Sequence, residues 1–240
     1  MVGRIIVTSA DMSEVHGNRI GVLGGTFDPV HNGHLAMAEH VLNVFRLDSL
    51  LFIPAARPPH KDHSKTTPFP NRLAMLELAT QENDRFLVSD LEAHRDGPSY
   101  SIDTLVDLKN LLVDKAKLFF VIGMDAFAEL NTWKKYRELT DYANLLIIDR
   151  PDCPLAMVDG VVDQLGDYSF DPGPACWVAP DHQGRIYPLT VPPVDISSTD
   201  IRVSIAEGQA FADLVPISVF QYISEQGLYQ GSTTESGLKV

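Results

Sequence analysis

One glycine- and histidine-rich stretch restricts what this chain can fold into more than any other feature of its sequence. It covers residues 24–34, reads Gly-Gly-Thr-Phe-Asp-Pro-Val-His-Asn-Gly-His, and follows the short apolar run at residues 20–23. The segment after it, residues 35–45, places apolar side chains at helical spacing. The stretch is therefore predicted to be the turn between a buried strand and a helix, where backbone N–H groups and the helix dipole favour an anion.

Two kinds of residue in this turn suit a phosphate ligand. Gly24 and Gly25 carry no Cβ, so the backbone there can approach a ligand closely. His31 and His34 lie three residues apart, close enough to face one phosphate together. Their imidazoles can donate hydrogen bonds to phosphate oxygens, more strongly as charge builds up on those oxygens. Each piece alone also fits an ordinary turn or solvated histidines, but the run as a whole is far more specific.

A proline-rich turn with three potential cations follows the apolar run at residues 49–54. It contains Arg57, His60 and Lys61. The turn is either a solvated loop or a mobile ligand-binding loop at the carboxyl end of a strand, where open α/β sheets bind ligands. In the second case Lys61 supplies a point charge for a phosphate and His60 a further donor.

Two later segments also have both a structural and a functional interpretation. Ser99 or Ser101 can cap the helix that follows them. Asp125 comes directly after the apolar strand expected at residues 117–123, where it can cap a helix or accept hydrogen bonds from ribose hydroxyls. Trp133, eight residues further on, is either a core anchor or a stacking surface.

The last chemical signal is the segment Asp-Ile-Ser-Ser-Thr-Asp-Ile-Arg at residues 195–202. Ser197 or Ser198 can cap a helix there, which by itself explains the hydroxyls. Arg202 is less easily explained, because a positive charge is unfavourable near the positive end of a helix. It is accounted for if an anion binds at this helix start.

These motifs together resemble the nucleotidylyltransferase superfamily, whose signature is a glycine-rich strand end followed by His-x-Gly-His. The longer form at residues 24–34 is similar to the nicotinate-nucleotide adenylyltransferase family in particular. Ile-Ser-Ser-Thr-x-Ile-Arg at residues 196–202 matches the family's second signature, which grips the triphosphate of ATP. The resemblance covers residues 19–229 nearly completely, with two signatures and three supporting segments in the expected order.

The resemblance implies a role for each matching residue. The catalytic residues would be His31, His34 and Arg202. The residues that bind ATP would be Gly24, Gly25, Thr26, Phe27, His34, Gly123, Asp125, Ile196, Ser197, Ser198 and Arg202. Those that bind nicotinate mononucleotide would be His60, Lys61, Tyr100, Ser101, Asp125, Trp133 and Arg150. Ser101 stands where threonine is usual, which keeps the hydroxyl, and stacking of Trp133 on an electron-poor pyridinium is favourable by the cation–π argument.

The implied reaction converts ATP and nicotinate mononucleotide into nicotinate adenine dinucleotide and pyrophosphate. The mononucleotide phosphate would attack the α-phosphorus of ATP in line, so catalysis is positioning plus charge stabilisation. Mg²⁺ would be held mainly by phosphate oxygens and water, and no protein residue is expected to bind a metal. Other enzymes remain open as alternatives: relatives that adenylylate nicotinamide mononucleotide or both pyridine mononucleotides, and relatives that adenylylate phosphopantetheine. A third is a non-catalytic nucleotide-sensing module, against which the histidines and Arg202 count.

Composition excludes other classes of protein. The formal net charge of −13 argues against a nucleic-acid binder, because a phosphate backbone needs a basic face. Anionic substrates would then need cations gathered at the site, or a divalent metal. No apolar run reaches the ~18 residues of a membrane span. Cys153 and Cys176 do not require a disulfide, so a reduced cytoplasmic protein is expected.

Apolar strands alternate with helical segments between residues 20 and 150. This order predicts an α/β fold with a Rossmann-like, doubly wound parallel sheet and helices on both faces, of the nucleotidylyltransferase type. Residues 1–18 are expected to be a flexible N-terminal extension, residues 19–230 a single domain, and residues 231–240 a frayed tail. The stretch at residues 152–193 is interpreted as an insertion or surface excursion. A homo-oligomer is compatible with the sequence.

Overall fold

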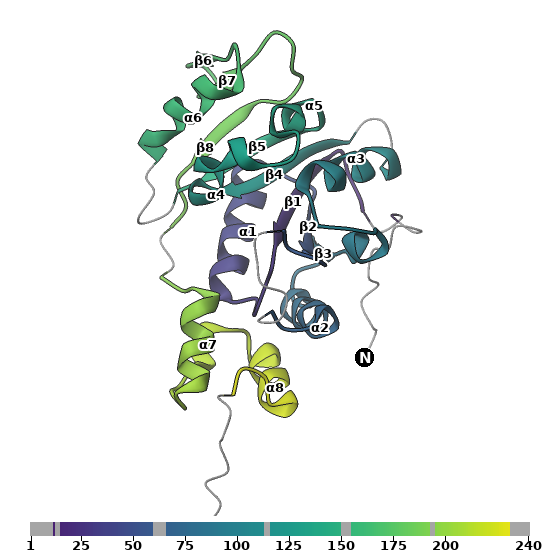
Figure 1. Cartoon of the computed structure of the whole chain (residues 1–240), viewed down its shortest axis with the longest axis vertical. Helices are drawn as coiled ribbons and strands as arrows, with labels where there is room; N and C mark the ends of the chain where they lie inside the picture. Colours follow the sequence, from purple (N-terminus) through teal and green to yellow (C-terminus); the bar gives the residue numbers. More distant parts are fainter. Residues whose placement is uncertain are drawn as a thin grey trace, which may run out of the picture.

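The computed structural model describes residues 12, 15–59, 66–112, 116–149, 155–192 and 195–230. Its centre is an eight-stranded sheet with the strand order β3-β2-β1-β4-β5-β8-β7-β6 (Figure 1). The strands are β1 (Arg19–Gly25), β2 (Ser49–Pro54), β3 (Phe86–Val88), β4 (Lys117–Gly123), β5 (Ala143–Ile148), β6 (Ser169–Asp171), β7 (Cys176–Val178) and β8 (Ile186–Leu189). The helices are α1 (Asn32–Val44), α2 (Phe69–Thr80), α3 (Ser101–Leu111), α4 (Met124–Ala128), α5 (Leu139–Tyr142), α6 (Val158–Leu165), α7 (Ser198–Ala206) and α8 (Ile217–Gln226).

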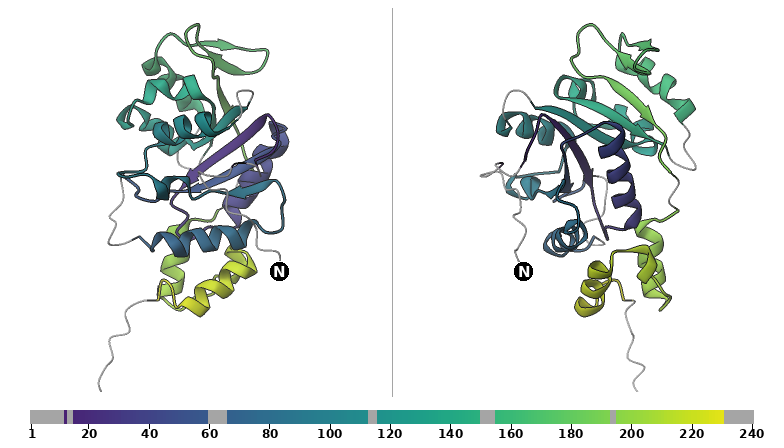
Figure 2. Two further views of the ribbon diagram at one scale, coloured as in Figure 1. Left: turned by 90° about the vertical axis from the view of Figure 1, so that its right-hand side faces the viewer. Right: turned by 180° about the vertical axis from the view of Figure 1, so that it is seen from behind.

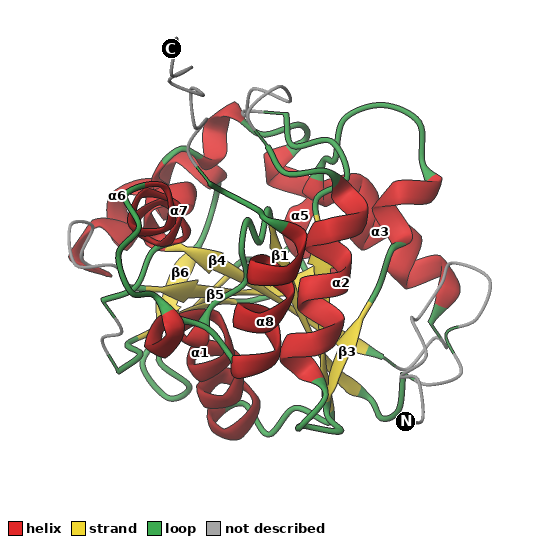
Figure 3. Cartoon of the chain, turned by 90° about the horizontal axis from the view of Figure 1, so that it is seen from below, coloured by secondary structure: helices red, strands yellow, loops and turns green. Residues whose placement is uncertain are grey.

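Helices cover both faces of the sheet, because successive strand side chains point to opposite faces. Val22 of β1 belongs to an apolar cluster with residues of α3, α4, α5 and α6. Its neighbour Leu23 belongs to a second cluster with residues of α1, α2, α7 and α8. Figure 3 shows α1 and α3 on opposite sides of the strands. The predicted fold, with its mostly parallel sheet between two helical layers, is confirmed.

The strand order indicates which edge of the sheet is expected to bind a ligand. From β1 the chain proceeds to β2 and β3 on one side, and then returns to β4 on the other side of β1. The β1–β2 and β1–β4 pairs are both parallel, and Leu23 pairs with Val121 two residues before each strand ends. Ligands of open α/β sheets bind in the crevice at such a reversal of strand order, outside the carboxyl ends of the strands. By this rule, the ligand crevice is expected between the carboxyl ends of β1 and β4.

The stretch interpreted as an insertion or surface excursion extends the sheet. It contains α6, and its strand β8 pairs in parallel with β5, after which β7 and β6 continue the sheet antiparallel. The strands β6 and β7 have three residues each, too few for an alternating pattern to be recognised.

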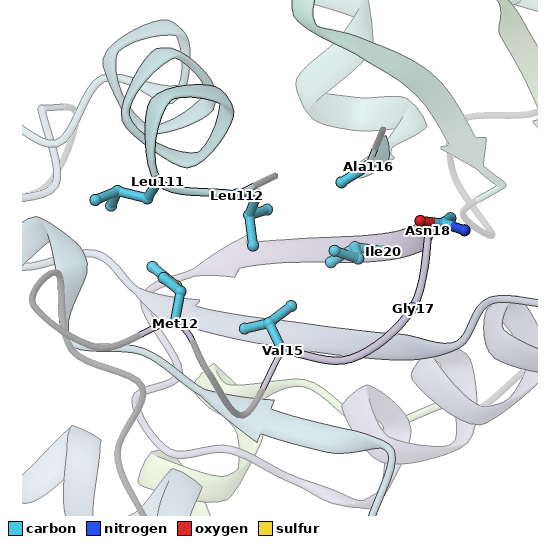
Figure 4. Close-up of a pocket in the computed structure, with 8 residues that line it drawn as sticks. All are labelled: Met12, Val15, Gly17, Asn18, Ile20, Leu111, Leu112 and Ala116. Carbon is cyan, nitrogen blue, oxygen red and sulfur yellow. The ribbon is translucent and has the colours of Figure 1, made fainter. Parts of the chain in front are cut away.

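The described part of the expected N-terminal extension packs against the body of the protein. Met12 and Val15 lie against the apolar cluster under α3. They help to line a cavity of about 270 Å³ at the amino-terminal edge of the sheet, opposite the crevice (Figure 4), together with Gly17, Asn18, Ile20, Leu111, Leu112 and Ala116. Residues 1–11 lie outside the described part of the chain, so flexibility there remains a prediction. The described helices include none whose length and hydropathy would suit a bilayer span.

Candidate active site

The turn after β1 presents two imidazoles in close contact at the start of α1, with their ring planes tilted by 32°. His31 is the N-cap residue of α1, with extended backbone angles, and its side chain is buried. The backbone N–H of His31 donates to Nδ1 of His34 at 3.3 Å, and the two ring centroids are 3.7 Å apart. Because Nδ1 of His34 accepts, a neutral His34 carries its proton on Nε2. His34 can therefore donate from Nε2 to an anion at the helix start.

The ring of Phe27 packs closely against Gly25, one of the two glycines in this turn. The backbone of Phe27 is left-handed, with φ of 51°, and its buried ring lies edge-on to the ring of His34, with the centroids 5.1 Å apart. A Cβ on Gly25 would lie 3.0 Å from that ring, closer than an ordinary van der Waals contact, so internal packing favours glycine at this position. A Cβ on Gly24 would make only an ordinary contact, at 3.7 Å from Phe120. Close approach of a ligand therefore remains the better explanation for Gly24.

The start of α7 meets this turn, although about 170 residues separate them in the sequence. Ser197 is the N-cap of α7 and accepts from the backbone N–H of Asp200 at 3.1 Å, as the sequence predicts. Ser198 Oγ donates to the carbonyl of Pro29 at 2.9 Å, and Arg202 Nη1 donates to the carbonyl of Asp28 at 2.8 Å. Figure 1 shows α7 beside the first turn of α1. The two predicted signatures thus lie in contact with each other.

The end of β4 lies on the other side of the crevice. Gly123 is the N-cap residue of α4, and Asp125 is the second residue of that helix, with an exposed side chain. Asp125 does not occupy the cap position, so the capping interpretation is wrong. Ile196, just before α7, is partly buried against the same apolar cluster as α1.

The start of α3 is joined to the proline-rich turn after β2. Tyr100 occupies the N-cap position of α3 without a capping side-chain hydrogen bond, and Ser101 is the first helical residue. The expectation that Ser99 or Ser101 caps this helix is therefore wrong. Ser99 instead makes two hydrogen bonds with Arg57: its Oγ accepts from the Arg57 N–H at 3.0 Å, and its own N–H donates to the Arg57 carbonyl at 2.9 Å.

Trp133 lies next to the start of α3. Its partly buried ring packs edge-on against Phe120, with the centroids 6.5 Å apart, so it contributes to the core and keeps part of its surface accessible. The adjacent Lys134 donates to both carboxylate oxygens of Asp103, at 2.8 and 2.9 Å, and lies 5.0 Å from the ring centroid of Tyr100. The structure thus brings Tyr100, Ser101 and Trp133 to one region. His60, Lys61 and Arg150 lie outside the described residues.

Comparisons with known proteins agree with this arrangement. The family described as cytidylyltransferase-like matches residues 22–204. A probable nicotinate-nucleotide adenylyltransferase from a Geobacter species is 41% identical over 213 residues, which cover 88% of this chain and 98% of the relative. The protein of that name from Pseudomonas fluorescens is 40% identical over 214 residues, covering 89% and 98%.

The chain belongs to the nicotinate-nucleotide adenylyltransferase family. Solved structures agree on the fold. The Plasmodium falciparum nicotinic acid mononucleotide adenylyltransferase complexed with NaAD superimposes with a TM-score of 0.69 at 18% identity, over 89% of this chain and 98% of that one. The structure of that enzyme complexed with APC gives a TM-score of 0.67.

One buried part of this adenylyltransferase was missed by sequence reasoning. Arg72 of α2 is 1% exposed, and its guanidinium donates to the carbonyls of Thr26, Ala55 and Thr67 at 2.7 to 2.9 Å. Burial lowers the pKa of Arg72, and the nearby carboxylate of Asp28 opposes that shift. The sequence does contain a signal for this burial. Arg72 lies on the same face of α2 as the apolar residues Met75, Leu76 and Ala79, which are all buried.

Proposed function

We propose that this chain transfers AMP from ATP to nicotinate mononucleotide, giving nicotinate adenine dinucleotide and pyrophosphate as a step of NAD biosynthesis. One observation carries the proposal. Arg202 of α7 and the adjacent histidines His31 and His34 lie at one strand-to-helix turn, at the N-terminus of α1. Such a cluster suits a polyphosphate, because the guanidinium, the imidazole N–H and the backbone N–H groups all donate to anionic oxygens.

The ATP half of the site is assigned to the crevice between β1 and β4. The triphosphate lies over the start of α1, within reach of His34 and Arg202, with Ser197 and Ser198 at the start of α7. The remaining ATP contacts are assigned to Gly24, Gly25, Thr26, Phe27, Gly123, Asp125 and Ile196. Exposure of Asp125 beside the β1 turn supports a ribose contact on this edge.

The mononucleotide half is assigned to the region of Tyr100, Ser101 and Trp133. Trp133 would stack on the pyridine ring, and Asp125 would contact the sugar. His60 and Lys61 are proposed to bind the mononucleotide phosphate, and Arg150 to contribute a further cation. The two hydrogen bonds between Arg57 and Ser99 support this grouping, because they join the turn that leads to His60 and Lys61 to the start of α3.

The chemistry follows from this placement. An oxygen of the mononucleotide phosphate forms a bond to the α-phosphorus of ATP as the bond from that phosphorus to the leaving pyrophosphate breaks. The attacking phosphate is already a nucleophile, so no general base is needed, and the enzyme contributes alignment and stabilisation of the developing charge. His31 and His34 face the α-phosphate in this assignment, and Arg202 holds the departing phosphates.

Mg²⁺ would enter with ATP. Among the described residues no group of three or more His, Cys, Asp or Glu side chains could hold a metal ion. We expect the ion to be bound through phosphate oxygens and water, where it would neutralise charge on the leaving pyrophosphate. We also infer a cytoplasmic location, from two cysteines that require no disulfide.

Pyrophosphate release tests the function. The assay contains ATP and Mg²⁺ and compares nicotinate mononucleotide with nicotinamide mononucleotide, beside the variant His34→Ala. We expect release with a clear preference for the acid in the wild type, and release at least about a hundredfold slower in the variant. Equal rates would indicate dual specificity and would contradict the assigned pyridine pocket. ATP binding without release from either mononucleotide would overturn the enzyme and support a nucleotide sensor.

A further inference from the structure

A buried polar network lies behind the proposed phosphate site, and the functional assignments above give it no role. At its centre is the carboxylate of Asp28, only 4% exposed, in the turn between β1 and α1. Asp28 Oδ1 accepts a hydrogen bond from the hydroxyl of Tyr229 at 2.7 Å. Asp28 Oδ2 accepts one from the backbone N–H of Thr67 at 3.1 Å. A buried carboxylate is stable only if such donors satisfy it.

The same residue also positions the proposed triphosphate clamp. The backbone carbonyl of Asp28 accepts the 2.8 Å hydrogen bond from Arg202 Nη1. Its carboxylate, held by Tyr229 and Thr67, restricts the orientation of the whole residue. The hydroxyl of Tyr229 is therefore linked to the guanidinium of Arg202 through a single residue.

Arg72 extends the network to the other substrate loop. Its three carbonyl partners are Thr26 in the turn after β1, Ala55 directly after β2, and Thr67 ahead of α2. Ala55 and Thr67 flank the proline-rich loop assigned to the mononucleotide phosphate. One buried guanidinium thus joins both ends of that loop to the turn that holds the histidines.

Tyr229 is held in place at a conformational cost. It follows α8 and adopts a left-handed backbone, with φ of 63°, which residues other than glycine rarely adopt. Such a conformation persists where tertiary contacts determine it. Burial raises the pKa of the Tyr229 hydroxyl, and the neighbouring Asp28 carboxylate adds to that shift, so the hydroxyl stays protonated and continues to donate near neutral pH. Figure 2 shows α7 and α8 together at one end of the molecule, and Tyr229 lies three residues after the end of α8.

We propose that Tyr229 is a positioning residue for adenylyl transfer, which fixes the Arg202 guanidinium against the ATP triphosphate through Asp28. The proposal rests on the proposed function, because it takes Arg202 as the triphosphate clamp. It predicts that the Tyr229 hydroxyl affects the use of ATP more than the use of the mononucleotide, since Thr67 is also held by Arg72.

Two matched variants test the inference. Tyr229→Phe removes only the hydroxyl that bonds to Asp28. Tyr222→Phe removes a hydroxyl of α8 that accepts from Asn71 Nδ2 of α2 at 3.3 Å. Losing the donor to a buried carboxylate should lower kcat/KM for ATP about tenfold in Tyr229→Phe, with the KM for the mononucleotide within about twofold of the wild-type value. Tyr222→Phe should leave both constants within about twofold.

A double-mutant cycle separates positioning from general destabilisation. In an Arg202→Ala background, Tyr229→Phe should cause little further loss of kcat/KM, because both changes disrupt one linked set of contacts. Full additivity, or equal effects of the two Tyr→Phe variants on the use of ATP, would overturn the inference. All assays are run well below the melting temperature of each variant, measured separately.

Calorimetric titration with ATP distinguishes failure of the inference from failure of the proposed function. Weaker ATP binding in Tyr229→Phe than in Tyr222→Phe supports the positioning role, even if the wild-type protein releases no pyrophosphate. Equal ATP affinity in the wild type and Tyr229→Phe, alongside unchanged turnover, contradicts the role while leaving the enzyme assignment intact.

Discussion

At the scale of single residues, the orientation of each candidate site side chain depends on which of its atoms make internal hydrogen bonds. His34 accepts a backbone hydrogen bond through Nδ1, which leaves Nε2 as its donor. Arg202 uses one guanidinium nitrogen on the carbonyl of Asp28 and another on the hydroxyl of Thr199, at 3.3 Å. These internal contacts fix the direction of both side chains, which is the preorganisation that stabilisation of developing charge requires.

Replacing His34 tests this directly. His34→Ala should lower kcat by about 10²- to 10³-fold, the usual cost of losing one preorganised donor to developing charge. The matched control is His40→Ala, six residues further along α1, which should keep kcat near the wild-type value. A comparable loss in both variants would show that the effect comes from the helix and not from the donor.

The raised pKa of Tyr229 predicts a change in stability at high pH. Burial, with a contribution from Asp28, raises this pKa above the ordinary value of 10.0. Below that value both the folded and the unfolded states hold the proton, so stability does not change with pH on this account. Above it the unfolded state loses the proton first, so the free energy of unfolding falls as pH rises. Denaturant titrations above pH 10 should show a steeper fall in the wild type than in Tyr229→Phe, and parallel slopes would contradict the assignment.

At the scale of secondary structure elements, helix starts decide where the site residues lie. The Ser197 cap of α7 was predictable, because a serine cap bonds within its own first turn. The start of α3 was not, because Ser99 is engaged by Arg57 from 42 positions earlier in the chain. The Ser99 hydroxyl thus bonds to a residue that folding brings close in space, and it does not cap the helix.

Removing the α7 cap should affect stability and activity together. Ser197→Ala leaves the Asp200 N–H without its acceptor, which typically costs about 1 kcal/mol in the free energy of unfolding. The KM for ATP should rise as well, because Arg202 lies on this helix. Ser197→Asn, which retains a capping acceptor, should restore most of the stability in denaturant titrations. Failure of asparagine to restore stability would mean that the cap is not the relevant contact.

At the scale of the whole molecule, the reversal of strand order and the two C-terminal helices bring distant residues together. The sheet brings the ends of β1 and β4 side by side, while α7 and α8 bring Arg202 and Tyr229 back to the first turn. In a chain with a net charge of −13, this arrangement places the guanidinium of Arg202 beside the start of α1.

Truncation tests the role of the end of the chain. A chain that ends at Gln230 should keep wild-type kcat/KM for ATP, because it retains the Tyr229 contact with Asp28. A chain that ends at Leu228 should lose at least as much as Tyr229→Phe. Pyrophosphate release and thermal melts of both truncations provide the measurement. Loss of activity in the chain that ends at Gln230 would assign a function to residues 231–240, which are expected to be a frayed tail.

The sequence by itself determined the α/β class, the strand-to-helix turn with its two histidines, and the capped start of α7. These features follow from local periodicity, missing Cβ atoms and side chains that bond within one helical turn. Only the tertiary structure decided that β6, β7 and β8 extend the sheet, that Ser99 binds Arg57 instead of capping, and that Arg72 joins the turn after β1 to both ends of the loop between β2 and α2. It also decided that Tyr229 reaches Asp28 across 201 positions. Such contacts depend on which distant groups folding brings together, because a buried polar atom takes whichever partner lies nearest in space.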